Sequence, residues 1–454
     1  MKRFSFVARL GVSDKDAVAI IQKDSVVHEV NFVDHHNTLG FGLGHALAQL
    51  GSIGLAPSET SVDLTLIAAI VNAGDTRVSR AINAQDGWTR EIDLYIPVSV
   101  PDLWRLQAER LAALLRFLTG DRWRFFFRPR PDTQATLVRP VSTLPLDTLD
   151  EVCLFSGGLD SLIGVIDLLK GGKRPLLVSH YWDAETASAQ AYLLSRLEKR
   201  FPGPEIRNLR VRLGFNSNDL GTGETENTQR GRSFLFFALA ALAASALGRP
   251  IRVNVPENGL IALNVPLDPL RFGALSTRTA HPHFIAGMNA LFQNIQIPGT
   301  LVNPYRHATK GEMVAGCADL PFLRKVAENS MSCSSPAKAR FRSLSPRHCG
   351  YCVPCLIRRA SLDAGLGVPD LTPYSVAVSK TQPLFSDRKE GEHVRSFQLM
   401  AKRIEASPSL SAILVHKPGP LGDSASEISA YAEVFRRGVI EVGKLLDGVV
   451  TKPH

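Results

Sequence analysis

Residues 151–161 decide the fold, and they read Glu151-Val152-Cys153-Leu154-Phe155-Ser156-Gly157-Gly158-Leu159-Asp160-Ser161. The first five predict an apolar strand, and the apolar spacing of 162–169 predicts a helix. Paired glycines allow a sharp turn between them, so backbone N–H groups and hydroxyls converge beside a helix N-terminus, where the dipole favours an anion. The sequence therefore predicts a phosphate-binding loop made of Ser156, Gly157, Gly158, Leu159, Asp160 and Ser161.

This loop differs from the phosphate loop of kinases and GTPases. It lacks the lysine and the longer spacing of a Walker A motif, so we do not expect it to hold a γ-phosphate. Asp160 and Ser161 are candidate catalytic residues because they stand where phosphate and Mg²⁺ would meet. The alternative is an ordinary glycine turn before a helix.

A cysteine cluster near the end of the chain is the second strong signal. Its members are Cys333, Cys349, Cys352 and Cys355, spaced C-x2-C-x2-C with one thiol upstream. This spacing predicts a closed tetrahedral zinc site with four thiolates. An iron-sulfur cluster is a weaker alternative, because the further cysteine and proline of the ferredoxin motif are absent. A disulfide framework fits poorly with 6 Cys in 454 residues. Cys153 and Cys317 are expected to be buried core residues.

Residues 151–365 resemble 7-cyano-7-deazaguanine synthase, the QueC enzyme, which belongs to the PP-loop ATP pyrophosphatases. The matching motifs, in order, are the loop 156–161, a helix start at Arg232-Ser233-Phe234-Leu235-Phe236, the run Thr309-Lys310-Gly311-Glu312-Met313, and Ser332-Cys333 with the later cysteines. The synthase's own Tyr-Pro-Asp-Cys-Arg substrate stretch is not found. With extra segments on both sides, the layout resembles the QueC-like proteins of bacterial anti-phage systems such as Qat.

The resemblance implies an adenylation reaction. ATP would bind the loop, with Arg232 among its ligands, and be cleaved between its α and β phosphates. Mg²⁺ and Lys310 would neutralise the pyrophosphate while a carboxylate, that of 7-carboxy-7-deazaguanine or a relative, becomes an acyl-adenylate. An amine would then displace AMP; it could be ammonia or an amino group on a protein partner from the same defence system. Alternatives are a synthase that releases a free nitrile, a nucleic-acid-modifying PP-loop enzyme, and a nucleotide sensor without turnover.

Strand and helix patterns alternate from 151 to about 304, which predicts an α/β fold with a doubly wound parallel sheet. Ligands bind at the carboxyl ends of such strands, so His180, after the second strand, is expected near the adenosine. Glu257, Asn258 and Gly259 follow another buried strand, and the first two could read a purine-like ring. A plain turn is the alternative.

Thr277, Arg278 and His281 suit a substrate carboxylate or a developing charge. A proline-bounded loop is the alternative reading of these residues. The polar segment 215–230 is expected to be a mobile loop over the site, with acids that could meet Mg²⁺ or a partner.

The remaining sequence predicts three domains: 1–148, an α+β accessory domain; 149–374, the nucleotide-binding core with its zinc region 333–355; and 375–454, a helical extension. Strands are predicted at 4–11, 17–21 and 26–33, and helices at 39–51 and 62–74. In the extension, an apolar stripe should dock on the core or on another protein; it comprises Ile428, Tyr431, Phe435, Val442, Leu445 and Leu446.

Composition and charge limit the partners. The excess of Lys+Arg 52 over Asp+Glu 43 gives a net charge of +9, which is compatible with phosphate ligands, acidic proteins or nucleic acid. The stretch 122–130 interleaves arginines with aromatic residues, and we interpret it as a half-buried strand in preference to a nucleic-acid surface. No segment is apolar enough to span a membrane, and no signal peptide is expected, so the protein is predicted to be cytoplasmic.

Overall fold

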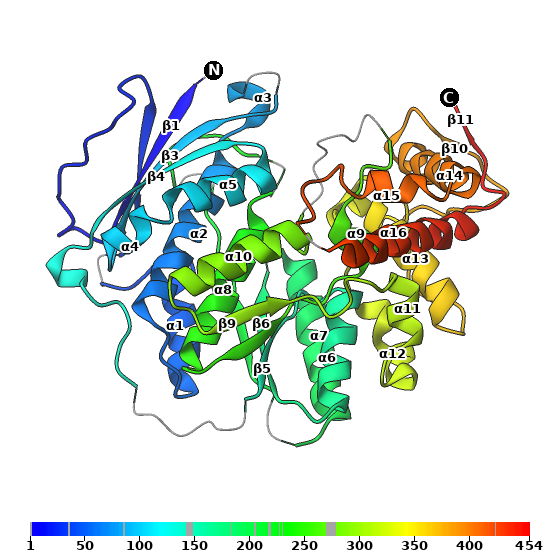
Figure 1. Cartoon of the computed structure of the whole chain (residues 1–454), viewed down its shortest axis with the longest axis horizontal. Helices are drawn as coiled ribbons and strands as arrows, with labels where there is room; N and C mark the ends of the chain where they lie inside the picture. The colour runs from blue at the N-terminus through cyan, green and yellow to red at the C-terminus, as the bar shows by residue number, and fades with distance from the viewer. Residues whose placement is uncertain are drawn as a thin grey trace.

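The computed structural model describes residues 2–34, 37–84, 87–141, 149–181, 183–203, 206–216, 219–226, 228, 230–268, 278–422 and 424–454. Two parallel β-sheets lie side by side, and the C-terminal helices pack against the second sheet's helices on the opposite side from the N-terminal sheet (Figure 1). The protein therefore has the α/β architecture that the alternating pattern predicts.

The central sheet has five parallel strands in the order β7-β6-β5-β8-β9. Their bounds are β5 Glu151–Leu154, β6 Pro175–His180, β7 Asn208–Val211, β8 Ile251–Asn254 and β9 Gly299–Val302. The chain continues from β5 toward one edge, whereas β8 joins the other side of β5. The carboxyl ends of β5 and β8 thus form the topological switch point at which such sheets bind ligands.

Helices cover both faces of this sheet because its strands are apolar on both sides. Val152 and Leu154 of β5 share a core cluster with α8 (Arg232–Ala246), whereas Cys153 and Phe155 share another with α6 (Leu159–Lys170) and α7 (Ala184–Arg200). Alternate residues of one strand therefore serve opposite layers, as the doubly wound prediction requires. Cys153 and Cys317 are buried as expected.

The N-terminal sheet has the order β2-β1-β3-β4, and each of its pairs is parallel. Its strands are β1 Arg3–Arg9, β2 Val26–Asn31, β3 Glu91–Val98 and β4 Arg122–Pro129. The prediction of an α+β region is therefore wrong, since all strand pairs are parallel and helices connect β2 to β3 and β3 to β4, as in an α/β unit. The predicted strand at 17–21 is also wrong, because these residues form a loop.

Helix α2 (Glu59–Arg77) joins the two sheets into one structure. It packs against β1 and β3 on one side and α8 on the other, and nearly all of its residues are buried. A single core cluster consequently contains side chains of both sheets. The other helical elements of this region are α1 Leu43–Ser52, α3 Arg80–Asn83, α4 Pro101–Arg105, α5 Ala108–Thr119 and the 3-10 turn Asp132–Gln134. The expected boundary at 148 lies outside the described residues.

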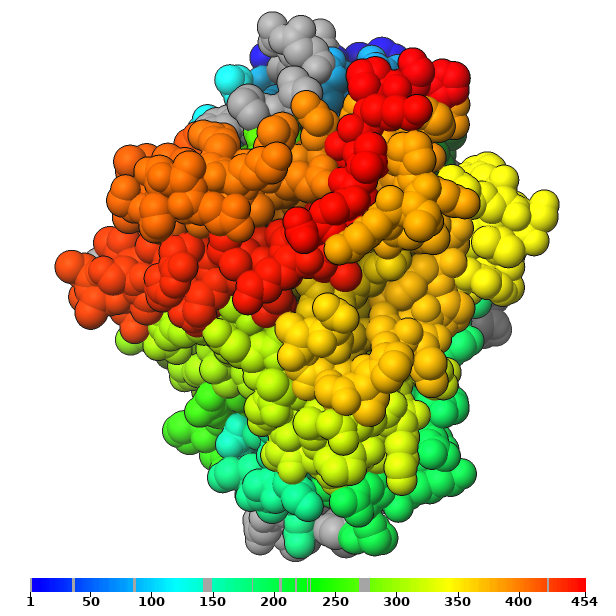
Figure 2. Space-filling model, turned by 90° about the vertical axis from the view of Figure 1, so that its right-hand side faces the viewer, coloured from blue at the N-terminus to red at the C-terminus, as the bar shows by residue number. Residues whose placement is uncertain are grey.

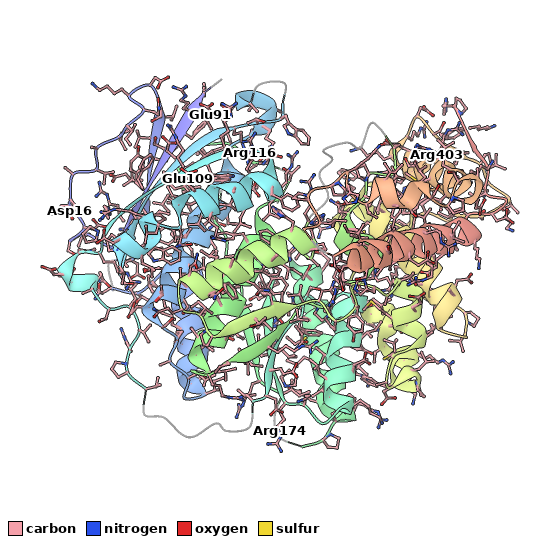
Figure 3. All side chains as sticks on the ribbon, viewed as in Figure 1. Asp16, Glu91, Glu109, Arg116, Arg174 and Arg403 are labelled. Carbon is pink, nitrogen blue, oxygen red and sulfur yellow. The ribbon has the colours of Figure 1, made fainter. Side chains whose placement is uncertain are left out.

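Strand β4 confirms the half-buried interpretation of 122–130. Trp123, Phe125 and Phe127 are buried, while the arginines between them face acids. Glu91, the first residue of β3 and labelled in Figure 3, accepts from Arg122 at 3.0 Å. Asp93 holds Arg124 through two bonds of 2.7 Å. These cations are already paired, which weakens the case for a nucleic-acid surface on this strand.

The remaining elements connect the central sheet to a C-terminal layer. They are α9 Gly259–Leu263, α10 Pro282–Asn294, α11 Lys310–Ala315, α12 Leu320–Val326, the 3-10 turns Ala327–Asn329 and Pro336–Arg342, α13 Val353–Gly365, β10 Leu384–Phe385, α14 Lys389–Ala406, α15 Leu410–Leu414, α16 Ala425–Leu445 and β11 Thr451–Lys452. Figure 2 shows α16, in red, crossing over the yellow-green and gold segments that contain α11 and α13. The predicted apolar stripe of α16 docks on α9, α13, α14 and α15. Among the described helices, none has the length and apolar character needed to cross a membrane.

Candidate functional site

The glycine loop connects β5 to α6 as predicted. Gly157 has a φ of +83°, and a Cβ atom there would lie 3.0 Å from Gln190, so both the turn and the packing favour glycine. The Oγ atom of Ser156 accepts from the Gly158 N–H at 3.3 Å and lies 3.2 Å from Oγ of Ser161. The two hydroxyls therefore face each other across the first turn of α6.

The N-terminus of α6 presents backbone donors at this loop. Within the described part of the chain, the backbone N–H groups of Asp160 and Ser161 have no hydrogen-bond partner. The Leu159 N–H donates to the Ser332 hydroxyl at 3.3 Å. Free first-turn N–H groups and the helix dipole together make an anion-binding surface.

Asp160 lies at the centre of a buried polar cluster. Its Oδ1 atom is 3.1 Å from Nζ of Lys310, and its Oδ2 atom accepts from Nδ2 of Asn258 at 2.7 Å. A carboxyl oxygen of Glu257 also makes a hydrogen bond with Asp160. These groups come from the start of α6, the end of β8 and the start of α11, so the fold brings them to the switch point.

The two carboxyl groups of this cluster titrate in opposite directions. Burial raises the pKa of Glu257 well above its ordinary value of 4.5, and the adjacent Asp160 charge raises it further. Burial works against ionisation of Asp160 too, but the Lys310 charge and the hydrogen bonds from Glu257 and Asn258 lower its pKa below 3.8. In the absence of a ligand, Asp160 therefore carries the charge and Glu257 holds a proton.

Asn258 and Gly259 serve the fold as well as the cluster. Oδ1 of Asn258 accepts from the Ile261 N–H at 3.1 Å and caps α9, so both amide atoms are used internally. Gly259 packs against the Arg306 carbonyl, where a Cβ atom would collide, and its N–H donates to Ala308 at 2.9 Å. Of the three residues predicted to contact a purine-like ring, Glu257 is therefore the one whose side chain neither caps a helix nor is limited to a close backbone contact.

His180 and Arg232 lie at the carboxyl side of the sheet. The His180 ring is buried, its Nε2 atom is 2.9 Å from the Leu213 carbonyl, and burial with the nearby Arg232 charge lowers its pKa to about 3. His180 is thus a neutral, packed ring. Burial lowers the pKa of Arg232, and the nearby Asp183 charge opposes that change. Its guanidinium makes no hydrogen bond or ion pair with the described residues.

Among the described residues, the side-chain contacts of Arg278 and His281 are with α5 and α10 and include no member of the Asp160 cluster. The Arg278 guanidinium stacks over Phe117 at 4.8 Å and donates to the Phe117 carbonyl at 2.9 Å. His281 caps α10 by accepting from the His283 N–H, and its ring centroid is 5.0 Å from that of Phe117. Both side chains therefore anchor α10 to α5. Thr277 lies outside the described residues.

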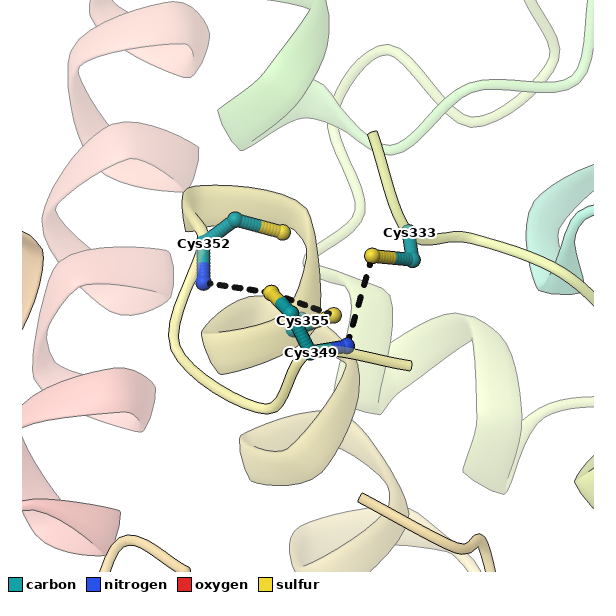
Figure 4. Close-up of side chains that lie close together, drawn as sticks. All are labelled: Cys333, Cys349, Cys352 and Cys355. Atoms are coloured by element: carbon teal, nitrogen blue, oxygen red, sulfur yellow. Dashed lines mark hydrogen bonds between the residues drawn. The ribbon is translucent and has the colours of Figure 1, made fainter. Parts of the chain in front are cut away.

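The four predicted thiols meet at one point (Figure 4). Their sulfur atoms all lie within 4.8 Å of one another, and Sγ of Cys349 is 3.8 Å from that of Cys355. A tetrahedral zinc ion with bonds of about 2.3 Å requires sulfur separations of about 3.8 Å. Backbone N–H groups of Cys349 and Cys352 donate to sulfurs of Cys333 and Cys349 at 3.4 and 3.3 Å. The cluster fits a four-thiolate metal site and can hold an ion such as zinc.

The cysteine cluster is connected to the glycine loop through the segment before Cys333. The Met331 N–H donates to the Gly157 carbonyl at 2.8 Å, and Ser332 accepts from Leu159. Arg358, fully buried on α13, donates to the Ser330 hydroxyl at 2.7 Å and fixes the same segment. A metal ion bound by the cysteines would therefore stabilise the glycine loop through the segment 330–332.

An ionic network in the N-terminal region fixes the backbone beside Arg232. Asp75 accepts from the Gly231 N–H at 2.7 Å. Its other oxygen contacts Arg90 at 2.9 Å and Arg80 at 3.2 Å, and both arginines also contact Asp121. The start of α8 is thus held by a carboxylate on α2, the helix that packs against the N-terminal sheet.

The segment 215–230 docks on the N-terminal region over its described part. Glu224 accepts from the Ser79 N–H at 2.9 Å, and Glu226 accepts from the Arg80 N–H at 2.8 Å. These acids hold the start of α3, which differs from the Mg²⁺ or partner contacts expected of them.

Several contributors to this site were not predicted as site residues, and all of them except Ser332 carry no sequence signal. Ser332, Arg358 and Asp75 act through hydrogen bonds to residues far away in the chain, and no motif surrounds Asp75 or Arg358. Gln190, which donates to the Ser156 and His180 carbonyls at 3.2 Å, lies in an ordinary helical pattern. Ser332 alone was marked, by its place beside Cys333.

A scan against protein-family models and a search of curated proteins give no match for this chain.

Proposed function

We propose that this protein is a PP-loop ATP pyrophosphatase of the QueC-like kind that adenylates a carboxylate. The observation that carries the proposal is the contact between Asp160 and Lys310 beneath the open N-terminus of α6. A carboxylate, a lysine and free backbone donors at one switch point are the groups that Mg²⁺, a leaving pyrophosphate and ATP phosphates require.

ATP phosphates bind the glycine loop in this proposal. The N–H groups of Asp160 and Ser161 and the hydroxyls of Ser156 and Ser161 donate to phosphate oxygens. Arg232 supplies a cation at the same edge of the sheet, and among the described residues no hydrogen bond or ion pair occupies its donors.

Asp160 and Glu257 are the proposed ligands of Mg²⁺. Two carboxyl groups that share one proton can instead share a divalent cation, and Mg²⁺ in nucleotide sites is bound by one or two carboxylates together with phosphates. With Mg²⁺ bound in place of the Glu257 proton, the ion would neutralise the charge of Asp160. The ammonium of Lys310 would then be available to contact the departing pyrophosphate.

The reaction follows from these positions. A carboxylate oxygen of the substrate attacks the α-phosphorus, the bond to the β-phosphate bridging oxygen breaks, and pyrophosphate leaves with its charge neutralised by Lys310 and Mg²⁺. An amine nitrogen attacks the acyl carbon of the adenylate, AMP leaves, and the amine loses a proton to solvent. The carboxylate is that of 7-carboxy-7-deazaguanine or a relative. The thiolate cluster, with zinc bound, has a structural role because all four positions are filled by protein.

The acceptor amine belongs to a protein of the same bacterial defence system in this proposal, as suits a chain that resembles QatC. Extensive flanking regions around a nucleotide site provide the surface that a macromolecular acceptor needs. Release of a free nitrile remains the main alternative, and the paired arginines of β4 disfavour nucleic acid as the substrate.

Incubation with ATP, Mg²⁺ and 7-carboxy-7-deazaguanine tests the proposal. We expect AMP and pyrophosphate in equal amounts, and no AMP from Asp160→Ala. With candidate partners added, intact mass spectrometry should show a mass increase on one of them. Free nitrile at a rate indifferent to every partner would replace conjugation with small-molecule synthesis. Absence of pyrophosphate under all conditions would leave a sensor.

A further inference from the structure

Glu441, on the C-terminal helix α16, reaches into the turn that carries Lys310. Its Oε2 atom accepts from the Thr309 hydroxyl at 2.6 Å, and its Oε1 atom accepts from the Gly311 N–H at 3.0 Å. One carboxylate thus holds the residues immediately before and after Lys310. Nothing in the sequence motifs marks Glu441.

The turn needs such support because α11 is short. Helix α11 spans Lys310–Ala315, too few residues to fix its own direction. A capping box between Thr309 and Glu312 satisfies the N–H groups of these two residues. The capping box leaves the N–H groups of Lys310 and Gly311, and Glu441 accepts from that of Gly311. The carboxylate therefore adds a bond to the first turn that the capping box does not make.

Two glycines allow α13 and α16 to approach the turn closely. A Cβ atom on Gly311 would lie 2.7 Å from the Glu441 carboxyl carbon. A Cβ atom on Gly365 of α13 would lie 2.5 Å from the Gly311 carbonyl oxygen. The first turn of α11 is therefore enclosed between α13 and α16, with glycine at both contacts.

A second contact from α16 supports the same segment. Arg437 donates to Glu312 at 2.7 Å and to the His307 carbonyl at 2.8 Å. Lys310 itself is buried, and its Nζ atom lies 3.1 Å from Asp160. A displacement of the turn would consequently move the ammonium away from the carboxylate and from any phosphate beside it.

We infer that Glu441 is a positioning residue for Lys310, so that the C-terminal region completes the adenylation site. This inference rests on the proposed role of Lys310 in pyrophosphate departure. The helix acts on the reaction only through the lysine, because Glu441 contacts the backbone and hydroxyl of the turn and not the Asp160 cluster.

The test compares Glu441→Ala and Glu441→Gln with the control Glu433→Ala. Glu433 lies on the same helix and, within the described part of the chain, forms ion pairs with Arg436 and Arg437 at the helix surface. Glutamine can still accept from Gly311 and donate to the Thr309 oxygen, so it should rescue the alanine variant. We expect kcat for AMP formation to fall about 100-fold in Glu441→Ala with little change in the KM for ATP, and to stay within about 3-fold in Glu441→Gln.

Accessibility of Lys310 provides a readout that does not depend on turnover. Acetylation by a lysine reagent, followed by peptide mass spectrometry, should label Lys310 faster in Glu441→Ala than in the native protein or in Glu433→Ala. If no carboxylate substrate supports AMP formation, but acetylation of Lys310 is faster in Glu441→Ala as expected, the proposed function fails and the positioning role stands. Unchanged labelling and unchanged kcat in a folded Glu441→Ala protein would overturn the inference. Equal loss in the alanine and glutamine variants, parallel to a lowered Tm, would do the same.

Discussion

The hydroxyl of Ser332 accepts a hydrogen bond of 3.3 Å from the backbone N–H of Leu159. Ser332, which precedes the first thiol of the cysteine cluster, thus contacts the first residue of α6, the helix that follows the glycine turn. The cysteine cluster and the glycine loop are therefore joined through a single segment of chain, so a metal ion at the first and the proposed nucleotide at the second would be coupled.

Purified protein should contain about one zinc ion per chain. We expect Cys352→Ser to lower the free energy of unfolding by more than about 3 kcal/mol, because it removes a ligand from a closed site. Cys317→Ser, a buried thiol outside the cluster, should cost less. Elemental analysis and denaturant titration provide the measurements. Folded, active protein without zinc would contradict this prediction.

Asp160→Asn should abolish AMP formation. The amide keeps the shape of the side chain but removes the charge that Lys310 and the proposed Mg²⁺ require. Asp167→Asn, on the same helix but bonded to Tyr305 and Ala318, is the matched control and should keep its activity. Chromatographic measurement of AMP distinguishes the two; comparable AMP production by both variants would rule out the PP-loop assignment.

Glu257 should make stability depend on pH without ligand. Because its folded pKa is raised above 4.5, the protonated group contributes stability that is complete below that value and is lost as pH rises through the folded pKa. Thermal melts of the ligand-free protein should show this decline, and Glu257→Gln should reduce it. A pH dependence identical in both proteins would show that Glu257 does not hold the proton.

Binding of Mg²⁺ with ATP should release that proton. Calorimetry in buffers of different ionisation enthalpy measures the number released, which should approach one per site at pH values below the folded pKa of Glu257. Glu257→Gln has no proton to release and should bind Mg²⁺-ATP more weakly. Equal proton release by the native protein and this variant would place the metal elsewhere.

Arg232→Ala should raise the KM for ATP by about 10-fold or more, since a charge-assisted contact to phosphate is lost. Arg232→Lys should recover part of the loss. Arg174 is exposed beside the first residue of β6, at the opposite end of the strands (Figure 3), so Arg174→Ala should leave KM unchanged. An unaltered KM in Arg232→Ala would exclude this arginine from the ATP site.

Local signals allowed part of the site to be predicted. A strand, paired glycines and a helix are adjacent in sequence, so their geometry is decided within a few residues, and the loop 156–161 formed as expected. The cysteine spacing similarly constrains three of its four ligands to one turn. Glu257 could be found because it directly follows a buried strand.

The rest of the site depends on contacts between distant parts of the chain. Asp75 and Glu441 each hold backbone N–H groups of residues more than a hundred positions away, and no local pattern records such pairing. The prediction of an α+β N-terminal region was wrong for a related reason. Alternating apolar residues predict a strand but not the direction of its partner strand, which is set by how the connecting segment returns the chain across the sheet.

Burial of α2 between the N-terminal sheet and α8 has a consequence for synthesis of the protein. The helix emerges from the ribosome with apolar side chains on all sides, but α8, which covers its second face, is made more than 150 residues later than its start. The N-terminal region therefore cannot finish folding when it appears. We expect its nascent form to expose an apolar surface, and to depend on chaperone protection until α8 has been translated.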